Sequence, residues 1–177
     1  MVVAPYLDTL LLLLVAAAAI NDLSSRRIPN RLLLAGLACA LVLHAVSPDP
    51  GQALLACLGG AVTGLLIFLP FYLLRGMAAG DVKMMATVGA FTGPALAVQI
   101  AILTWCAGGV MALAIILYRG RLRLALANLR GILRPALPPP HDGSAVPAPA
   151  IRESAGSMPY GLAIAAGTIY HLVSRYA

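Results

Sequence analysis

Two of the six acidic residues lie where a charge is costly. Asp22 follows an apolar run that ends at Ile20, and Asp81 directly precedes another apolar run that begins at Val82. A charge at membrane depth costs several kcal/mol, and such residues are usually kept for function. The other four acids lie in predicted termini or loops, where a solvated charge needs no explanation: Asp8, Asp49, Asp142 and Glu153.

A pair of carboxylates in a poorly hydrated site can activate water. Both cannot ionise cheaply, so one pKa rises and the pair shares a proton over the neutral range. The ionised partner can take a proton from a water that attacks a peptide carbonyl, and the protonated partner can polarise that carbonyl. Asp81 precedes a predicted helix start, where the helix dipole favours Asp81 as the more acidic partner. The alternative is that Asp22 and Asp81 only cap helix ends at the membrane interface.

The elements that would position these carboxylates are those of a membrane protein. Of the 177 residues, 61% are hydrophobic and 10% are charged, and the mean hydropathy is +0.93. Soluble domains average about 45–50% apolar and about 25% charged residues. This composition excludes a cytosolic enzyme, a secreted disulfide scaffold and a disordered regulator. The continuous Leu- and Ala-rich runs also argue against a membrane β-barrel, whose strands alternate polar and apolar residues.

Six apolar segments predict an all-α fold, a polytopic integral membrane bundle of about six transmembrane helices. The segments run from about Tyr6 to Ile20, Leu32 to Val46, Ala53 to Leu74, Val82 to Phe91, Ala95 to Tyr118 and Met158 to Val173. We interpret residues 1–177 as one membrane-embedded domain.

The basic residues predict the orientation of this bundle. All of them except Arg175 lie in the loops after the first, third and fifth segments, whereas the turns at 47–51 and 92–94 carry none. Basic loops stay on the cytoplasmic side of a bilayer. The N-terminus and the C-terminus are therefore predicted to be non-cytoplasmic, and Asp22 and Asp81 to lie at the cytoplasmic edge.

The long loop after the fifth segment has two parts. At about 119–134, arginines and leucines fall on neighbouring helical stripes, which predicts a basic interfacial helix against anionic lipid headgroups. The alternative is a solvated basic loop. The Pro-rich residues at about 135–157 predict a cytoplasmic linker. The net charge of +6 is thus assigned to membrane contact and not to nucleic acid.

The sequence offers no metal site. It contains no Cys-x-x-Cys pair and no His-x-x-x-His spacing. We expect Gly59, Gly60 and Gly64 to allow close helix packing. The cysteines lie inside apolar runs, where we expect them only to pack: Cys39, Cys57 and Cys106.

Four short motifs occur in order, each beside a predicted membrane segment. They are Asn21-Asp22, Arg27-Ile28-Pro29-Asn30, Gly80-Asp81-Val82-Lys83 and Met158-Pro159-Tyr160-Gly161. This pattern resembles the type IV prepilin peptidases, and most of all their short form in tight-adherence (Flp-type) pilus systems. The resemblance covers nearly the whole chain.

The resemblance implies a Gly-x-Gly-Asp aspartic protease of the bacterial inner membrane. Such an enzyme cuts the basic leader from prepilins at the cytoplasmic face, after a glycine. Asp22 and Asp81 would be the catalytic pair. The implied partners are a prepilin with its basic leader and apolar helix, the lipid bilayer and the pilus assembly machinery, and no cofactor is implied. The motif residues that would support the pair are Gly80, Lys83, Arg27, Pro29 and Asn30.

The chain departs from the family pattern at one position and lacks one domain. Ala78 stands where the family has its first glycine, and alanine fits there if its φ is negative. The tetracysteine zinc domain of the long-form enzymes is absent, which predicts peptidase activity without zinc. Two other functions stay open. One is a proton-coupled transporter with Asp22 and Asp81 as proton sites, and the other is an inactive scaffold of a pilus or secretion assembly.

Overall fold

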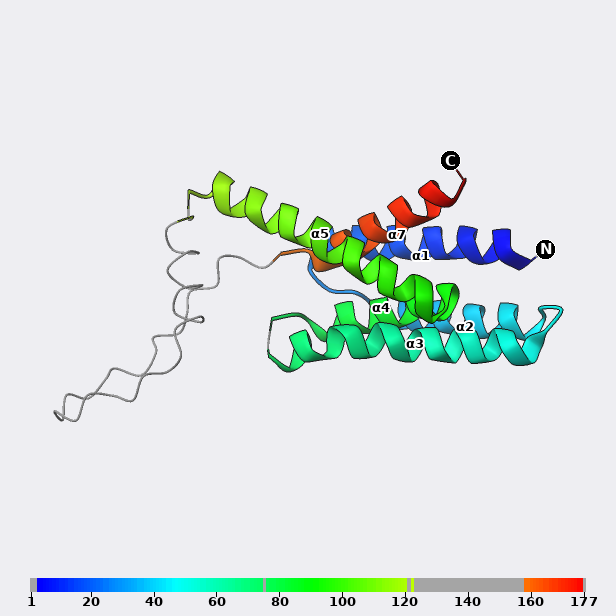
Figure 1. Ribbon diagram of the computed structural model, residues 1–177. Helices are drawn as coiled ribbons and strands as arrows, with labels where there is room; N and C mark the ends of the chain where they lie inside the picture. The colour runs from blue at the N-terminus through cyan, green and yellow to red at the C-terminus, as the bar shows by residue number, and fades with distance from the viewer. Residues whose placement is uncertain (1–2, 75, 121, 123–157, 177) are drawn as a thin grey trace, which may run out of the picture. The chain divides into compact units, whose positions relative to one another are not determined.

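The computed structural model describes residues 3–74, 76–120, 122 and 158–176, and the regular elements in these ranges are all α-helices (Figure 1). The helices are α1 (Val3–Ser25), α2 (Asn30–Ala45), α3 (Pro50–Leu73), α4 (Ala79–Thr92), α5 (Pro94–Tyr118) and α7 (Tyr160–Tyr176). Each corresponds to one of the six predicted apolar segments. Most of the predicted interfacial helix at 119–134 and all of the linker at 135–157 lie outside the described residues.

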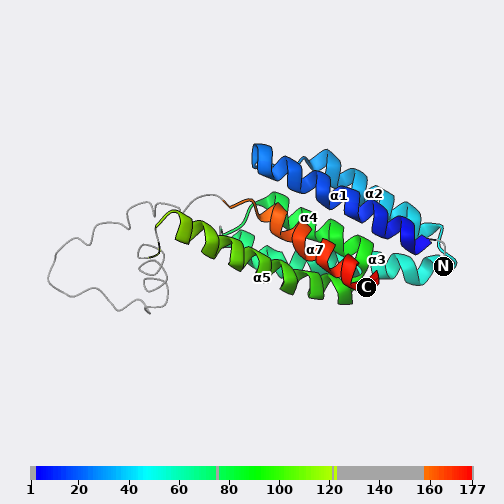
Figure 2. The same ribbon diagram turned by 90° about the horizontal axis from the view of Figure 1, so that it is seen from above.

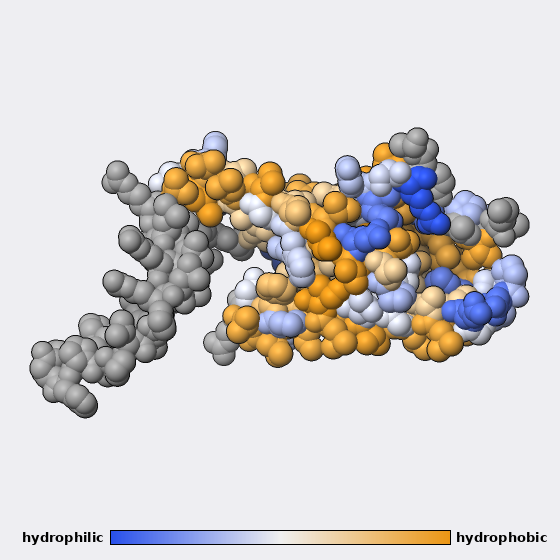
Figure 3. Space-filling model, viewed as in Figure 1, coloured by the Kyte–Doolittle hydropathy of each residue, from blue (hydrophilic) through white to orange (hydrophobic). Residues whose placement is uncertain are grey.

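Three of these helices are long and apolar enough to cross a membrane: Pro5–Ser25 within α1, then α3 and α5. A crossing takes about 20 residues. The other helices are shorter, with 16 residues in α2, 14 in α4 and 17 in α7. The all-α, multi-pass membrane architecture follows from these features, whereas six crossings and the side of each terminus stay predictions. Figure 3 shows hydrophobic residues covering much of the visible surface over α3.

Two helices extend further into polar sequence than the hydrophobic pattern indicates. Helix α1 continues through Asn21 to Ser25, and the side chains of both residues bond to carbonyls one turn earlier: Asn21 Nδ2 donates to that of Ala17 at 2.8 Å and Ser25 Oγ to that of Asn21 at 2.8 Å. It ends at Ser25, and the next residue, Arg26, has a left-handed backbone with a φ of 54°. Helix α4 begins at Ala79 and not at Val82. Both candidate aspartates are therefore inside helical turns.

The chain divides into two compact units, residues 1–109 with 159–177 and residues 110–158. Within the first unit, α1 packs against α7, and α3 packs against α4. Figures 1 and 2 both show α1 and α7 side by side. The second unit contains the last turns of α5, and its described residues are 110–120, 122 and 158.

Helices α3 and α4 meet backbone to backbone. A Cβ on Gly60 would overlap the carbonyl of Gly89, and a Cβ on Gly64 would overlap the carbonyl of Met85. The predicted packing role is therefore confirmed for Gly60 and Gly64. Gly59 differs, because a Cβ there would meet only the Pro94 ring at 3.8 Å.

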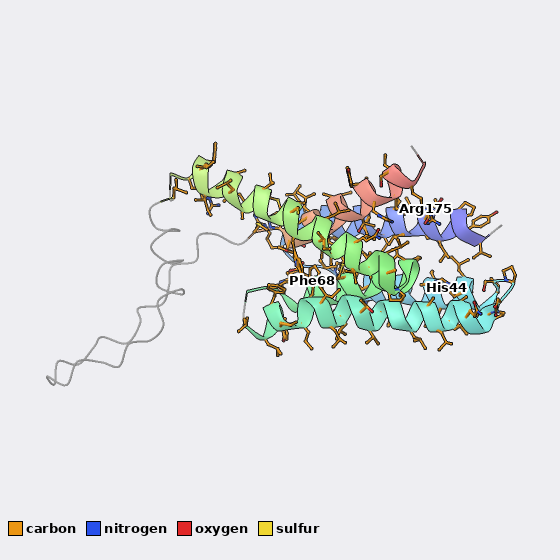
Figure 4. The ribbon with its side chains drawn as sticks, in the orientation of Figure 1. His44, Phe68 and Arg175 are labelled. Atoms are coloured by element: carbon orange, nitrogen blue, oxygen red, sulfur yellow. The ribbon has the colours of Figure 1, made fainter. Side chains whose placement is uncertain are left out.

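The first unit has two distinct ends. At one end, Arg175 of α7 pairs with Asp8 of α1 at 3.7 Å, and His44 Nε2 lies 3.1 Å from the Ala90 carbonyl oxygen. Figure 4 labels Arg175 and His44 toward this end and Phe68 farther along α3. At the other end, hydrogen bonds join the last turn of α1 to the start of α7, and the start of α2 to the start of α4. This second end holds both aspartates.

Candidate functional site

Asp22 lies in the last full turn of α1 and is only 6% exposed. Its Oδ2 accepts a hydrogen bond from the backbone N–H of Gly161 at 2.8 Å. Gly161 lies in the first turn of α7, where unpaired N–H groups and the helix dipole stabilise an anion. The carboxylate of Asp22 thus has a charge-stabilising donor supplied by a segment far away in sequence.

Asp81 lies in the first turn of α4 and is also 6% exposed. Its Oδ2 accepts from the backbone N–H of Ala78 at 3.3 Å, and its own N–H donates to the Ala78 carbonyl at 3.1 Å. The side chain and backbone of Asp81 therefore close the first turn of α4. This reciprocal pattern holds the carboxyl group in one place at the start of the helix.

The backbone of Ala78 is extended, with φ −80° and ψ 151°. Any residue adopts this conformation, so the turn before Asp81 does not need the family glycine for a positive φ. The condition under which alanine was expected to fit is met. Gly80 is helical, and a Cβ there would meet Ile28 at 3.5 Å, which is ordinary contact.

The two carboxyl groups influence each other electrostatically. Asp81 precedes the apolar run at 82–91 and lies outside the three candidate spans. Burial, and after it the negative charge of Asp22, raise the pKa of Asp81 to about 6, against the lowering effect of the Ala78 hydrogen bond. Burial and the charge of Asp22 therefore oppose the helix dipole that favoured Asp81 as the more acidic partner, and the order of the two acidities stays a prediction. Asp81 is the partner that holds a proton more readily than an ordinary aspartate.

The remaining motif residues lie around this pair without contacting both carboxyl groups. Lys83 Nζ donates to Asn30 Oδ1 at 3.1 Å, which ties the first turn of α4 to the first turn of α2. Pro29 precedes α2, and its carbonyl accepts from two N–H groups of the first turn. Arg27 is exposed in the short loop between α1 and α2. Lys83 and Pro29 therefore help to position the helix starts beside the site.

Gly161 is the site residue that side-chain chemistry alone does not reveal. Its motif, Met158-Pro159-Tyr160-Gly161, stands out in the sequence, but its contribution is a backbone donor. A Cβ on Gly161 would lie 2.9 Å from Asp22 Oδ2, so a side chain would crowd the carboxylate. The neighbouring Tyr160 ring packs edge-on against Phe68, with ring centroids 6.2 Å apart, and this contact fixes the start of α7.

Among the described residues, no group of three or more His, Cys, Asp or Glu side chains could hold a metal ion. The three cysteines are unpaired, with Cys57 in the core and Cys39 and Cys106 exposed.

Fold and site together define a helical membrane protein with two buried, interacting carboxyl groups at one end of its helices. Residues 9–113, more than half of the chain, match the model of the type IV leader peptidase family, and the chain belongs to that family. At the family level it is a peptidase with a prepilin-like substrate. No curated protein and no solved structure matches the chain. The matched range includes Asp22 and Asp81 but ends before α7, so the resemblance expected over nearly the whole chain is shown for 9–113.

Proposed function

We propose that this protein is a membrane aspartic endopeptidase that removes the leader from type IV, Flp-like prepilins at the cytoplasmic face of the bacterial inner membrane. The observation that carries the proposal is the pair of buried aspartates. Asp22 and Asp81 come from different helices, interact electrostatically and lie within the range matched by the family. Buried carboxyl pairs that share a proton are the machinery of aspartic proteolysis.

The surroundings of the two groups suggest their roles. Asp22 is the ionised base, because the Gly161 N–H at the start of α7 stabilises its carboxylate. Asp81, with its pKa raised to about 6, is the protonated acid. Asp22 takes a proton from water as the water oxygen bonds to the scissile carbonyl carbon, while Asp81 donates a hydrogen bond to the carbonyl oxygen. When the C–N bond breaks, the leaving amine takes the proton that Asp22 received from water, and Asp22 is ionised again.

The position of the pair suits a substrate that lies partly in the bilayer. A prepilin presents a basic leader followed by an apolar helix, and its scissile bond would then fall at headgroup depth. The backbone must be extended there, because a helical peptide bond is poorly accessible. The residues at 76–78, just before α4, are not helical, which supports an approach for an extended strand beside Asp81.

The two other functions have less support. A proton-coupled transporter needs ionisable residues along a path through the bilayer, but α3 and α5 contain no acidic or basic residue. Both buried aspartates lie at one end of the first unit instead. The case for an inactive scaffold began with alanine at position 78, and the extended backbone of Ala78, which alanine adopts without strain, weighs against it.

Cleavage of a prepilin-like peptide by the purified protein in detergent tests the proposal. The peptide carries a basic leader, a glycine and an apolar segment, and mass spectrometry reports the products. Asp22→Asn and Asp81→Asn should each lower kcat by at least about 100-fold, the range for loss of an acid or base. Asp49→Asn is the matched control, because Asp49 is exposed at the start of α3 and its side chain makes no capping hydrogen bond. Normal cleavage by either of the first two variants would refute the proposal.

A further inference from the structure

A groove of about 530 Å³ lies between α2, α3 and α4, away from the carboxyl pair. These three helices pack against one another in the first unit (Figure 1). The long wall of the groove is aliphatic, and a polar end lies where α2 and α4 begin, at Asn30, Arg31 and Lys83. The aliphatic wall consists of Leu33, Leu34, Leu37, Ala61, Val62 and Leu65.

The groove is separated from the carboxyl pair by the body of α4. Successive residues of a helix point about 100° apart, so Lys83 faces away from Asp81. Asp81 is buried and interacts with Asp22, whereas Lys83 is exposed and bonds Asn30 of α2. Neither aspartate lines the groove. An occupant of the groove is therefore not a peptide in the act of being cut.

The polar end of the groove is positively charged. Arg31 and Lys83 both line it, and no acidic residue does. Within the part of the chain that the structure describes, neither cation forms an ion pair. The Lys83 ammonium group has three N–H donors and uses one of them in its hydrogen bond to Asn30 Oδ1. The groove thus offers unneutralised cations and spare donors at one end of an aliphatic channel.

We propose that this groove binds one anionic phospholipid, with its phosphate between Arg31 and Lys83 and an acyl chain along the aliphatic wall. The charge complementarity favours this occupant, since basic pockets between membrane helices on the cytoplasmic side bind anionic headgroups. The positive-inside pattern places Arg31 and Lys83 at that depth. An apolar helix of a partner would cover the aliphatic wall but would leave Arg31 and Lys83 without an anionic partner.

The proposal is tested by counting lipids that the purified protein retains. Native mass spectrometry is carried out with equimolar phosphatidylglycerol and phosphatidylcholine of identical acyl chains, so that only headgroup charge differs. The wild type should retain phosphatidylglycerol preferentially, as one molecule per chain. Arg31→Gln and Lys83→Gln should each weaken this binding about fivefold, which corresponds to the usual contribution of one cation near an anionic lipid. Arg175→Gln, an exposed arginine at the opposite end of the first unit and outside the groove, is the matched control.

A second pair of variants tests the aliphatic wall. Val62→Trp places a bulky ring in the groove, and Val62 is 55% exposed, so the substitution does not enter the core. Leu55→Trp is its control, because Leu55 is 73% exposed on the same face of α3, two turns away from the groove. Only Val62→Trp should reduce retained lipid.

Several results would overturn the assignment of a phospholipid. They are equal retention of both lipids by the wild type, unchanged binding in Arg31→Gln and Lys83→Gln, and equal lipid loss in both tryptophan variants. A change from dimer to monomer in Val62→Trp with unchanged lipid binding would assign the groove to a second copy of the chain. None of these readouts depends on cleavage, so the lipid site and the peptidase proposal fail or succeed separately.

Discussion

Replacing Gly161 by alanine should impair catalysis by disturbing one hydrogen bond. The Gly161 N–H donates to Asp22 Oδ2 at 2.8 Å. A Cβ at this position would lie 2.9 Å from Asp22 Oδ2 and 3.2 Å from its Cγ, closer than carbon and oxygen atoms normally approach. Either α7 or the Asp22 side chain must shift, and in both cases the hydrogen bond lengthens.

The size of the effect follows from the type of bond. A hydrogen bond to a charged group contributes about 1.5–3 kcal/mol. Without that stabilisation the shared proton moves toward Asp22, so the form with Asp22 ionised and Asp81 protonated becomes less favourable by a similar amount. Each 1.36 kcal/mol lowers the population of this reactive form, and with it the rate, by about tenfold. We therefore expect kcat to fall by about tenfold to about a hundredfold. KM should change little, because Gly161 acts through Asp22 and not on the substrate.

The assay compares kcat and KM for a prepilin-like peptide, and Gly109→Ala is the matched control. Gly109 is also a helical glycine, but a Cβ there would meet nothing within 4 Å. Alanine is the better helix former by about 1 kcal/mol, so both variants gain local helix stability. Circular dichroism and the Tm in detergent separate a folding defect from a catalytic one. Cleavage by a folded Gly161→Ala within about twofold of wild type would refute the role of this hydrogen bond.

Three further predictions concern stability and the turn before the site. A pKa raised from 3.8 to about 6 means that folded Asp81 keeps its proton between those values while the unfolded chain loses it. Stability therefore falls as pH rises and is level above about pH 7. The stability of Asp81→Asn relative to wild type should increase by about 2 kcal/mol from pH 4 to pH 7, and equal changes in both proteins would contradict this. Ala78→Gly should keep kcat within about twofold and lower the stability by about 0.4–1 kcal/mol, because the extended backbone needs no glycine; a large change in kcat would show that the turn is misjudged. Gly60→Ala should lower the free energy of unfolding in detergent by about 1–3 kcal/mol, because its Cβ would overlap the Gly89 carbonyl. Gly59→Ala is its neighbouring control, and equal losses would argue against the close approach of α3 and α4.

Hydrophobic runs predicted where the helices are but not where they end. A run of apolar residues stops at the first polar residue, whereas helical hydrogen bonds continue through it. In α1 the helix continues past the apolar run through Asn21 to Ser25, whose side chains bond to carbonyls one turn earlier. The difference of a few residues matters, because it puts Asp22 inside a helical turn and not in a loop.

The carboxyl pair could be found from the sequence because a charge beside apolar runs is conspicuous. Its surroundings could not, since they depend on atoms that sequence patterns do not show. The donor to Asp22 is a backbone N–H from residue 161, which no side-chain motif reveals. The higher pKa of Asp81 comes first from burial, which is a property of the assembled helices and not of the local turn.

Helix α4 has the carboxyl pair on one side and the aliphatic groove on the other. Asp81 faces the carboxyl pair, while Lys83, two residues later, faces α2 and the aliphatic groove. Three contacts hold the helix between them: the hydrogen bond from Ala78 at its start, the bond from Lys83 to Asn30, and the backbone approach of Gly89 to Gly60. Lys83 therefore influences the site by fixing where α4 stands and not by touching reacting atoms. A ligand that engages Lys83 would act on the same helix turn that carries Asp81, so the proposed lipid site and the proposed peptidase site share α4 although they are lined by different residues.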